Sequence, residues 1–165
     1  MARAFIALGA NLGELRATLE AALAALGRLP SSELCAVSGA YYSAPIDSQG
    51  PDYLNAVAWL DTDLEPLALL SALQAIEQAH GRERPYRNAP RTLDLDLLSY
   101  ADQTWQCERL SLPHPRLHQR AFVLRPLLEL APDLALTPLG RLDAYLPDVQ
   151  DQVLTRLDEA LVAAS

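Results

Sequence analysis

The chain has 165 residues, is 50% hydrophobic and carries a formal net charge of −8. This length and composition are typical of one compact domain, so we expect residues 1–165 to form a single domain. The negative charge argues against a protein that coats nucleic acid, no apolar run reaches the ~18 residues of a membrane span, and two cysteines without a secretory signal indicate a cytoplasmic protein.

The hydrophobic pattern alternates between strand and helix periods. In chain order it predicts a strand at 3–8, a helix at 14–28, strands near 34–42 and 53–60, a helix at 65–80, a strand at 92–99, a short strand or hairpin arm at 104–111, a helix beginning near Leu117, and a last helix over 149–163. The order βαββαβ predicts an α+β fold of the ferredoxin-like class. We expect a largely antiparallel sheet with helices packed on it and a helical tail at the C-terminus.

Two aspartates interrupt the last strand of this core. The segment RTLDLDLL, residues 91–98, places Asp94 and Asp96 two positions apart among leucines. Alternate side chains of a strand share a face, so both carboxylates should point one way and the leucines between them the other. Such a pair suits Mg²⁺, which commonly takes one or two carboxylates together with phosphate oxygens. The alternative is an ordinary pair of surface aspartates at a strand edge.

The basic residues are all arginine, and eight of the 13 lie between positions 82 and 125. Arg82 and Arg84 fall in the loop GRERPYRNAP, and Arg91 opens the strand of the acid pair. Guanidinium groups bind phosphate oxygens in pairs, so this arrangement predicts a clamp for a polyphosphate. A solvated basic loop is the alternative.

The segment LPHPRLHQRAF adds His114, Arg116 and Arg120 as further potential phosphate or base contacts, and we expect His118 to be structural. Earlier in the chain, PDYLNA offers a stacking face and an amide that suit a flat heteroaromatic ring. On the predicted helix 65–80, Gln74 and Glu77 share a face. They would contact a nucleotide there or lie on the solvent side.

Taken in order, several motifs from about residue 4 to residue 134 resemble the hydroxymethyl-dihydropterin pyrophosphokinase family of folate biosynthesis. The motifs are ALGANLG, YSAP followed by QGPDYLNAV, IEQAHGRER, PRTLDLDLL and LPHPRLHQRAFVLRPLLELAPDL. The resemblance implies a ferredoxin-like α+β fold, in agreement with the predicted order of elements. It also implies transfer of pyrophosphate from ATP to the hydroxymethyl oxygen of a reduced pterin, with release of AMP and the use of two Mg²⁺ ions.

The resemblance further implies a role for individual residues. Asp94 and Asp96 match the metal ligands, and Arg82 and Arg91 the phosphate-handling, catalytic arginines. The residues matching the ATP site are Gln74, Glu77, Arg84, Leu98, Arg109, His114 and Arg120. Those matching the pterin pocket are Ser43, Ala44, Ile46, Tyr53, Asn55 and Phe122, with Tyr53 and Phe122 as the ring sandwich. We expect a monomer whose partners are these two small substrates, with no nucleic acid or membrane.

One departure from the family pattern keeps another function in view. Asn88 and Ala89 stand where well-known members carry tryptophan and glycine, and the loop is about one residue shorter. A non-catalytic or impaired pterin- or nucleotide-binding paralogue of the same fold is therefore the alternative. A single-stranded RNA module would need a basic sheet face with exposed aromatics, which the charge and the 6% aromatic content disfavour.

Overall fold

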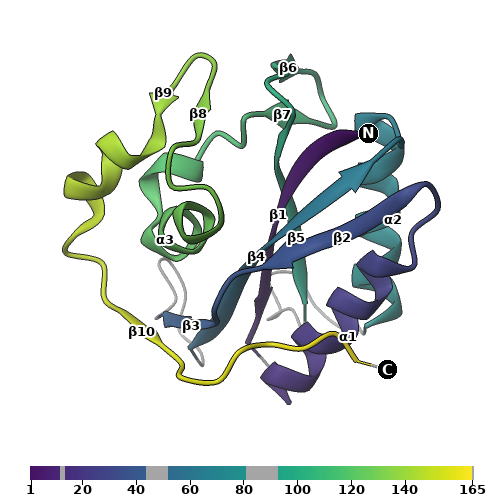
Figure 1. Ribbon diagram of the computed structural model, residues 1–165, viewed down its shortest axis with the longest axis horizontal. Coiled ribbons are helices and arrows are strands. Elements are labelled where there is room, and N and C mark those ends of the chain that lie inside the picture. Colours follow the sequence, from purple (N-terminus) through teal and green to yellow (C-terminus); the bar gives the residue numbers. More distant parts are fainter. Residues whose placement is uncertain (12–13, 44–51, 81–92, 165) are drawn as a thin grey trace.

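The computed structural model describes residues 1–11, 14–43, 52–80 and 93–164 (Figure 1). Its elements are β1 (Ala2–Ala10), α1 (Leu15–Gly27), β2 (Ser32–Val37), β3 (Tyr41–Ser43), β4 (Tyr53–Thr62), α2 (Pro66–Ala79), β5 (Asp94–Tyr100), β6 (Trp105–Gln106), β7 (Ser111–Leu112), the 3₁₀ turn η1 (Leu117–Gln119), α3 (Ala121–Leu130), β8 (Ala135–Leu136), β9 (Gly140–Arg141), the 3₁₀ helix η2 (Leu142–Val149) and β10 (Leu154–Arg156). No helix in these ranges is both long and apolar enough to cross a bilayer.

The main sheet is antiparallel throughout and has the order β10, β3, β4, β1, β5. Strand β2 also pairs with β4, beyond the end of β3, so β2 and β3 follow each other along the same edge of that long strand. The βαββαβ core and the antiparallel sheet are the ferredoxin-like arrangement that the sequence predicts.

Helices α1 and α2 cover one face of the sheet and α3 covers the other (Figure 1). Strand alternation explains how one strand serves both layers, because successive side chains point to opposite faces. In β1, Ile6 and Leu8 are buried against α1 and α2, whereas Phe5 is buried against α3. In β4, Leu60 is buried against α1 and α2, and Val57 is buried against α3. The sheet therefore has two apolar layers, and polar residues on either face stand out against them.

The strand predicted at 34–42 is broken into β2 and β3. Ser38 lies between them, and its hydroxyl oxygen accepts the backbone N–H of Val57 at 2.9 Å. The N–H of the next residue, Gly39, leaves the ladder and donates to Glu129 at 2.7 Å. Because these groups bond outside the regular pattern, β3 can begin again with its own register on β4.

The helix predicted over 149–163 is wrong. A 3₁₀ helix ends at Val149, Leu154–Arg156 forms β10 against β3, and no helix follows up to residue 164. Apolar spacing alone indicated a helix, but Leu161 is instead buried singly in the α1 and α2 layer. The N–H of Val162 donates to the Glu20 carboxylate at 2.7 Å. Tertiary partners thus satisfy the backbone of this tail in place of helical bonds.

Two of the remaining segments agree with expectation, whereas β8 and β9 were not predicted. The segment 104–111, predicted as a short strand or hairpin arm, lies in the hairpin of β6 and β7, with Trp105 paired to Leu112. The helix expected near Leu117 starts as the 3₁₀ turn η1 and continues as α3 after Arg120, whose backbone is extended. This interruption turns α3 onto the sheet face opposite α1 and α2.

Candidate active site

A row of polar and small residues crosses four strands on the α3 face of the sheet. Asp94 in β5 pairs with Gly9 in β1, Gly9 pairs with Asn55 in β4, and Asn55 pairs with Tyr41 in β3. Directly paired residues share a face. A Cβ added at Gly9 would stand 3.5 Å from Oδ1 of Asn55 and 3.7 Å from the Tyr53 ring. Because Gly9 has no side chain, a carboxylate and an amide flank this position of β1 with only its backbone between them.

The two aspartates of β5 lie on this same face. Leu95 and Leu97 are buried in the layer of α1 and α2, so Asp94 and Asp96 point to the other side, as the alternation predicts. Asp94 is half-buried and Asp96 is exposed. Asp96 pairs with Ala7, another small residue of β1. The carboxylates therefore border a strip of small residues in β1, Ala7 and Gly9.

The amide of Asn55 is held in one orientation. Its Nδ2 donates to Oγ of Ser43 at 2.7 Å and to the carbonyl of Tyr41 at 3.1 Å. Asn55 is only 4% exposed and Ser43 only 7%. With Nδ2 engaged on the β3 side, Oδ1 is directed over Gly9 as an acceptor. Buried hydrogen bonds of this kind fix which edge of the amide a ligand would meet.

His114 stands beside the acid pair on the segment that follows β7. Its backbone N–H donates to the carbonyl of Leu98 at 2.9 Å, and its Nδ1 accepts the backbone N–H of Arg116 at 3.2 Å. Burial lowers the pKa of His114, and Arg120 and Arg116 lower it further, while Asp96 acts in the opposite direction. The ring is therefore neutral near pH 7, with its proton on Nε2 as a donor.

A cavity of about 220 Å³ joins this histidine to Asp96 and to α2. Its lining includes Leu70, Asp96, Arg109, Ser111 and His114. Nη2 of Arg109 donates to Oγ of Ser71 at 2.9 Å, which ties the guanidinium to α2. Apolar, cationic and carboxylate groups thus meet in one concave place.

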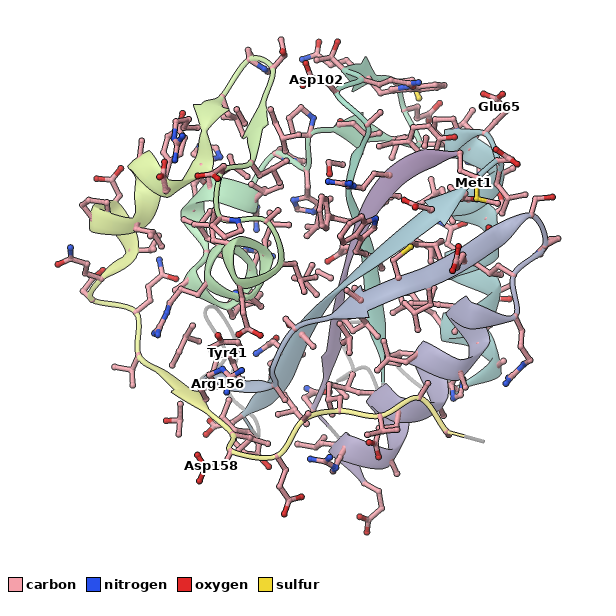
Figure 2. The ribbon with its side chains drawn as sticks, in the orientation of Figure 1. Met1, Tyr41, Glu65, Asp102, Arg156 and Asp158 are labelled. Atoms are coloured by element: carbon pink, nitrogen blue, oxygen red, sulfur yellow. The ribbon has the colours of Figure 1, made fainter. Side chains whose placement is uncertain are left out.

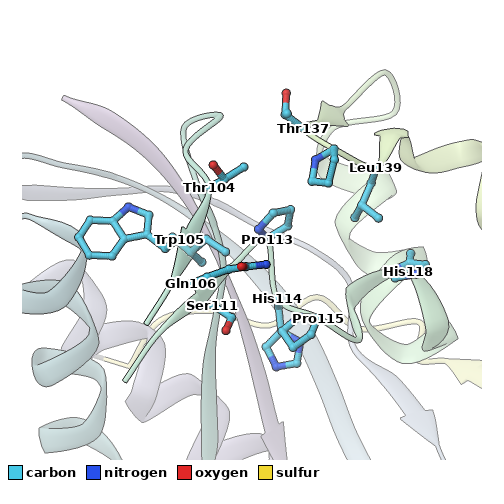
Figure 3. Close-up of a pocket in the computed structure, with 12 residues that line it drawn as sticks. Thr104, Trp105, Gln106, Ser111, Pro113, His114, Pro115, His118, Thr137 and Leu139 are labelled. Atoms are coloured by element: carbon cyan, nitrogen blue, oxygen red, sulfur yellow. The ribbon is translucent and has the colours of Figure 1, made fainter. Parts of the chain in front are cut away.

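A second cavity, of about 720 Å³, lies on the other side of the same segment, between the two small hairpins (Figure 3). Figure 3 shows Trp105 and Gln106 on one side of it and His118 and Leu139 on the other. The described residues that line it include no arginine or carboxylate. The His118 ring packs edge-on against Tyr145, with centroids 4.9 Å apart. The charged groups therefore gather in the smaller cavity.

A family model for 7,8-dihydro-6-hydroxymethylpterin-pyrophosphokinase (HPPK) matches residues 5–132, which include the strands of the acid pair and of the row. The chain belongs to the HPPK family. It is 51% identical over 148 residues to the 2-amino-4-hydroxy-6-hydroxymethyldihydropteridine pyrophosphokinase of Pseudomonas aeruginosa, a match covering 89% of each chain. It is 48% identical over 137 residues to the protein of the same name from Haemophilus influenzae, covering 82% of this chain and 86% of that one.

The fold agrees with a solved HPPK-DHPS structure in complex with substrates. The TM-score is 0.73 at 14% sequence identity, over 88% of this chain and 43% of that chain. This chain thus spans less than half of the HPPK-DHPS chain, and the likeness concerns the fold.

The structure gives several of the residues implied by the HPPK family a definite place. Ser43, Asn55 and Tyr53 gather on the β3 and β4 side of the row. Phe122 is half-buried in the first turn of α3, with the Arg120 guanidinium 5.5 Å from its ring centre. Arg109, His114 and Asp96 line the smaller cavity. The predicted residues Arg82, Arg84, Arg91, Ala44 and Ile46, together with Asn88 and Ala89, lie outside the described residues.

Three further residues that match the family's ATP site lie on α2 and β5. Glu77 is 3% exposed, and its Oε2 accepts the backbone N–H of Leu95 at 2.8 Å. Gln74 is exposed on α2. The Leu98 side chain is buried in the α3 layer, and its carbonyl holds His114, while Leu97 lines the cavity. Glu77 and Leu98 therefore support the strand and the histidine.

Sequence reasoning missed Gly9 and Ser111 as site residues. Gly9 lies in the motif ALGANLG, where the sequence gives no sign that a glycine separates Asp94 from Asn55. Only the pairing of Gly9 with both residues in the sheet shows this. Ser111 lies in the smaller cavity because of the β6–β7 hairpin. A short hairpin carries too little pattern to place such a side chain in advance.

Proposed function

We propose that this chain transfers pyrophosphate from ATP to the hydroxymethyl group of 7,8-dihydro-6-hydroxymethylpterin, releasing AMP, as a step in folate biosynthesis. Membership of the HPPK family and the names of its relatives support the reaction. The observation that carries the assignment of the site is the row in which the Asp94 carboxylate and the oriented Asn55 amide flank Gly9. One end of this row suits a cation with phosphates, and the other suits a polar ring.

The acid pair fits magnesium. Carboxylate oxygens are the hard ligands that Mg²⁺ prefers, and the ion commonly keeps most of its other positions for phosphate oxygens and water. Within the described ranges no group of three or more His, Cys, Asp or Glu side chains forms a fuller ligand set. We therefore assign Asp94 and Asp96 to two Mg²⁺ ions shared with ATP. Bound magnesium would neutralise phosphate charge and align the phosphate oxygens.

The protein's own groups handle the nucleotide around this pair. Neutral His114 donates from Nε2 to a phosphate or ribose oxygen. Arg109 supplies positive charge from the lining of the smaller cavity, and Arg120 supplies it from beside Phe122. Arg82, Arg84 and Arg91 are assigned to the phosphates by their match to the family motif. Phosphoryl transfers depend mainly on such positioning and charge stabilisation, since the protein has little covalent chemistry to supply.

The β3 and β4 side of the row receives the pterin. Oδ1 of Asn55 accepts N–H groups from the ring edge, and Tyr53 with Phe122 provides aromatic faces. This places the hydroxymethyl oxygen towards Gly9 and the acid pair. A bond then forms between that oxygen and the β-phosphorus, and the bond from the β-phosphorus to the bridging oxygen of the α-phosphate breaks, so that AMP leaves with that oxygen.

The strands of the row belong to one sheet, and the family match spans residues 5–132, which supports residues 1–165 as one pyrophosphokinase domain. We propose that this domain works as a monomer. Because both proposed substrates are small polar molecules, we propose that the reaction takes place in the cytoplasm.

The test is AMP formation from ATP, Mg²⁺ and hydroxymethyl-dihydropterin by the purified full-length chain. We expect AMP to appear only when all three are present and to fall by about 10²-fold or more in Asp96→Asn, a loss typical of missing charge stabilisation. Asp151→Asn, an exposed aspartate distant in sequence from the site, is the matched control and should keep wild-type activity. Tight binding of both substrates with AMP at background would instead identify an inactive paralogue, as the loop departure at Asn88 allows.

A further inference from the structure

The C-terminal tail adds a strand beside the proposed pterin site. Strand β10 pairs antiparallel with β3, with Leu154 opposite Ser43 and Arg156 opposite Tyr41. The family model matches residues 5–132, so this strand lies beyond the matched part. Figure 1 shows the tail passing β3 and then crossing towards α1. The three-residue strand β3 is thus held between β4 on one side and the tail on the other.

One carboxylate on α3 joins β3 and β10. Glu129 accepts the backbone N–H of Gly39 at 2.7 Å and the hydroxyl of Tyr41 at 2.6 Å, one on each oxygen. Nε and Nη2 of Arg156 donate to the same two oxygens at 3.2 and 3.3 Å. Figure 2 shows Tyr41 and Arg156 next to each other at β3. Four donors from two segments therefore converge on a single side chain of the helix.

The glycine in this cluster makes the close approach possible. A Cβ at Gly39 would stand 2.6 Å from Nη2 of Arg156, closer than real atoms come. The guanidinium of Arg156 also lies 5.8 Å from the centre of the Tyr41 ring, and Arg125 lies at the same distance from it. Arg156 is therefore packed between the bare backbone at Gly39 and an aromatic ring, which fixes its position beyond what one surface ion pair would do.

The helix carries this cluster and the proposed ring contact on one side. Glu129 follows Phe122 by seven residues, which is about two helical turns, so the two side chains share a face of α3. Phe122 belongs to one wall of the proposed pterin site, and Ser43 at the end of β3 belongs to the other. The hydrogen bonds from Glu129 to β3 therefore set the distance between the wall that contains Phe122 and the wall that contains Ser43.

We propose that β10 and the Arg156–Glu129 pair are a positioning device for the pterin side of the site. They hold β3 against α3, and β3 in turn holds the Asn55 amide through the Tyr41 carbonyl and the Ser43 hydroxyl. The inference depends on the proposed function for the identity of the ligand. Arg156 and Glu129 act through Asn55, so their loss changes recognition of the pterin more than the handling of ATP.

The experiment compares steady-state kinetics of Glu129→Gln, Arg156→Ala and Arg156→Lys in the full-length chain. Arg141→Ala is the matched control, since Arg141 also forms an exposed ion pair, with Asp133 and Asp143, in a different part of the chain. Glutamine keeps the size of Glu129 but cannot accept all four donors. We expect KM for the pterin to rise about tenfold in Glu129→Gln and Arg156→Ala, the effect of losing about one charged hydrogen bond. KM for ATP and kcat should stay near wild type, and Arg156→Lys should recover part of the loss.

A direct measurement separates positioning from general loss of structure. The Kd of hydroxymethyl-dihydropterin, followed by fluorescence titration in the presence of a non-hydrolysable ATP analogue, should rise in step with KM, while circular dichroism spectra remain those of wild type. Equal changes in KM for both substrates, or pterin affinity like that of Arg141→Ala, would overturn the inference. If wild type forms no AMP, the proposed function fails. If wild type is active and the variants match the control, the inference alone fails.

Discussion

Replacing Glu77 with alanine should weaken the edge strand that carries the acid pair. Glu77 is buried on α2, and its Oε2 accepts the N–H of Leu95 at 2.8 Å. Leu95 stands between Asp94 and Asp96, and β5 forms an edge of the described sheet. An unpaired N–H on an edge strand is usually satisfied by water or covered. Here the carboxyl group of a neighbouring helix covers it.

The size of the effect follows from the burial of both partners. Leaving a buried donor without its acceptor costs about 1–3 kcal/mol, so we take about 2 kcal/mol for Glu77→Ala. In a chain of this length each 1 kcal/mol lowers Tm by about 2–4 °C, which gives a fall of about 4–8 °C. Glu77→Gln retains an acceptor oxygen of similar reach and should lose less. The order of stability is therefore wild type, then Glu77→Gln, then Glu77→Ala.

Thermal melting followed by circular dichroism measures the loss, and amide hydrogen exchange locates it. The Leu95 amide should exchange faster in Glu77→Ala than in wild type, because local opening no longer breaks a side-chain bond. Gln78→Ala, an exposed change one residue along α2, is the control and should stay within about 0.5 kcal/mol of wild type. An alanine variant as stable as this control, with Leu95 equally protected, would refute the role given to Glu77.

Three further results are expected. Removing Mg²⁺ with a chelator should abolish AMP formation by wild type and leave its circular dichroism spectrum unchanged. A spectrum that changes to that of an unfolded chain would show that the metal stabilises the fold. Gly9→Val should fold but bind pterin poorly, because its methyl groups enter the space beside Asn55. Gly9→Ala should bind pterin more tightly than Gly9→Val, because its Cβ would stand at an ordinary contact distance of 3.5 Å from Oδ1 of Asn55. Equal pterin affinities of the two variants would place the ligand elsewhere. Burial raises the pKa of Glu129, but hydrogen bonds from Arg156, Tyr41 and Gly39 outweigh burial and hold that pKa below its ordinary 4.5. The folded protein therefore takes up this proton less readily than the unfolded chain. The stability that Glu129 contributes is present above the ordinary value and is lost as the pH falls through the lower, folded pKa. In urea melts, the difference in unfolding free energy between wild type and Glu129→Gln should be constant near neutral pH and shrink in acid, and a difference independent of pH would contradict this.

Strong periodicity made the core predictable. The alternation around Asp94 and Asp96 required both to share a face, because the intervening leucines could be buried only on the other side. The helix predicted at 65–80 was equally secure, since Leu69, Leu73 and Ile76 form one apolar stripe, and all three are buried. In these segments the local pattern and the tertiary burial agree, so the pattern alone was sufficient.

The tail could not be predicted in the same way. The apolar residues over 149–163 are compatible with a helix and equally with an extended tail whose apolar side chains are buried one by one. The choice was made by partners distant in sequence: β3 accepts Leu154–Arg156 as a strand, and Glu20 on α1 holds Val162. Short segments gain little from helix formation alone, so such contacts decide their structure. The same reasoning applies to the hydrogen bond between Glu77 and Leu95, since nothing local in the sequence shows that α2 lies beside β5.

The pairing of the central strands fixes the positions of the site residues relative to one another. Strands β1 and β4 pair without interruption from Ala2 with Thr62 to Ala10 with Leu54, which sets Gly9 opposite Asn55. A slip of one residue would turn every side chain of one strand to the other face and disrupt the packing of both apolar layers. The apolar layers therefore exclude that slip at a cost of many buried side chains. The energy that fixes the core thus also fixes the distance across Gly9 between the carboxylate and the amide, so substitutions that loosen this register should impair the site before they unfold the chain.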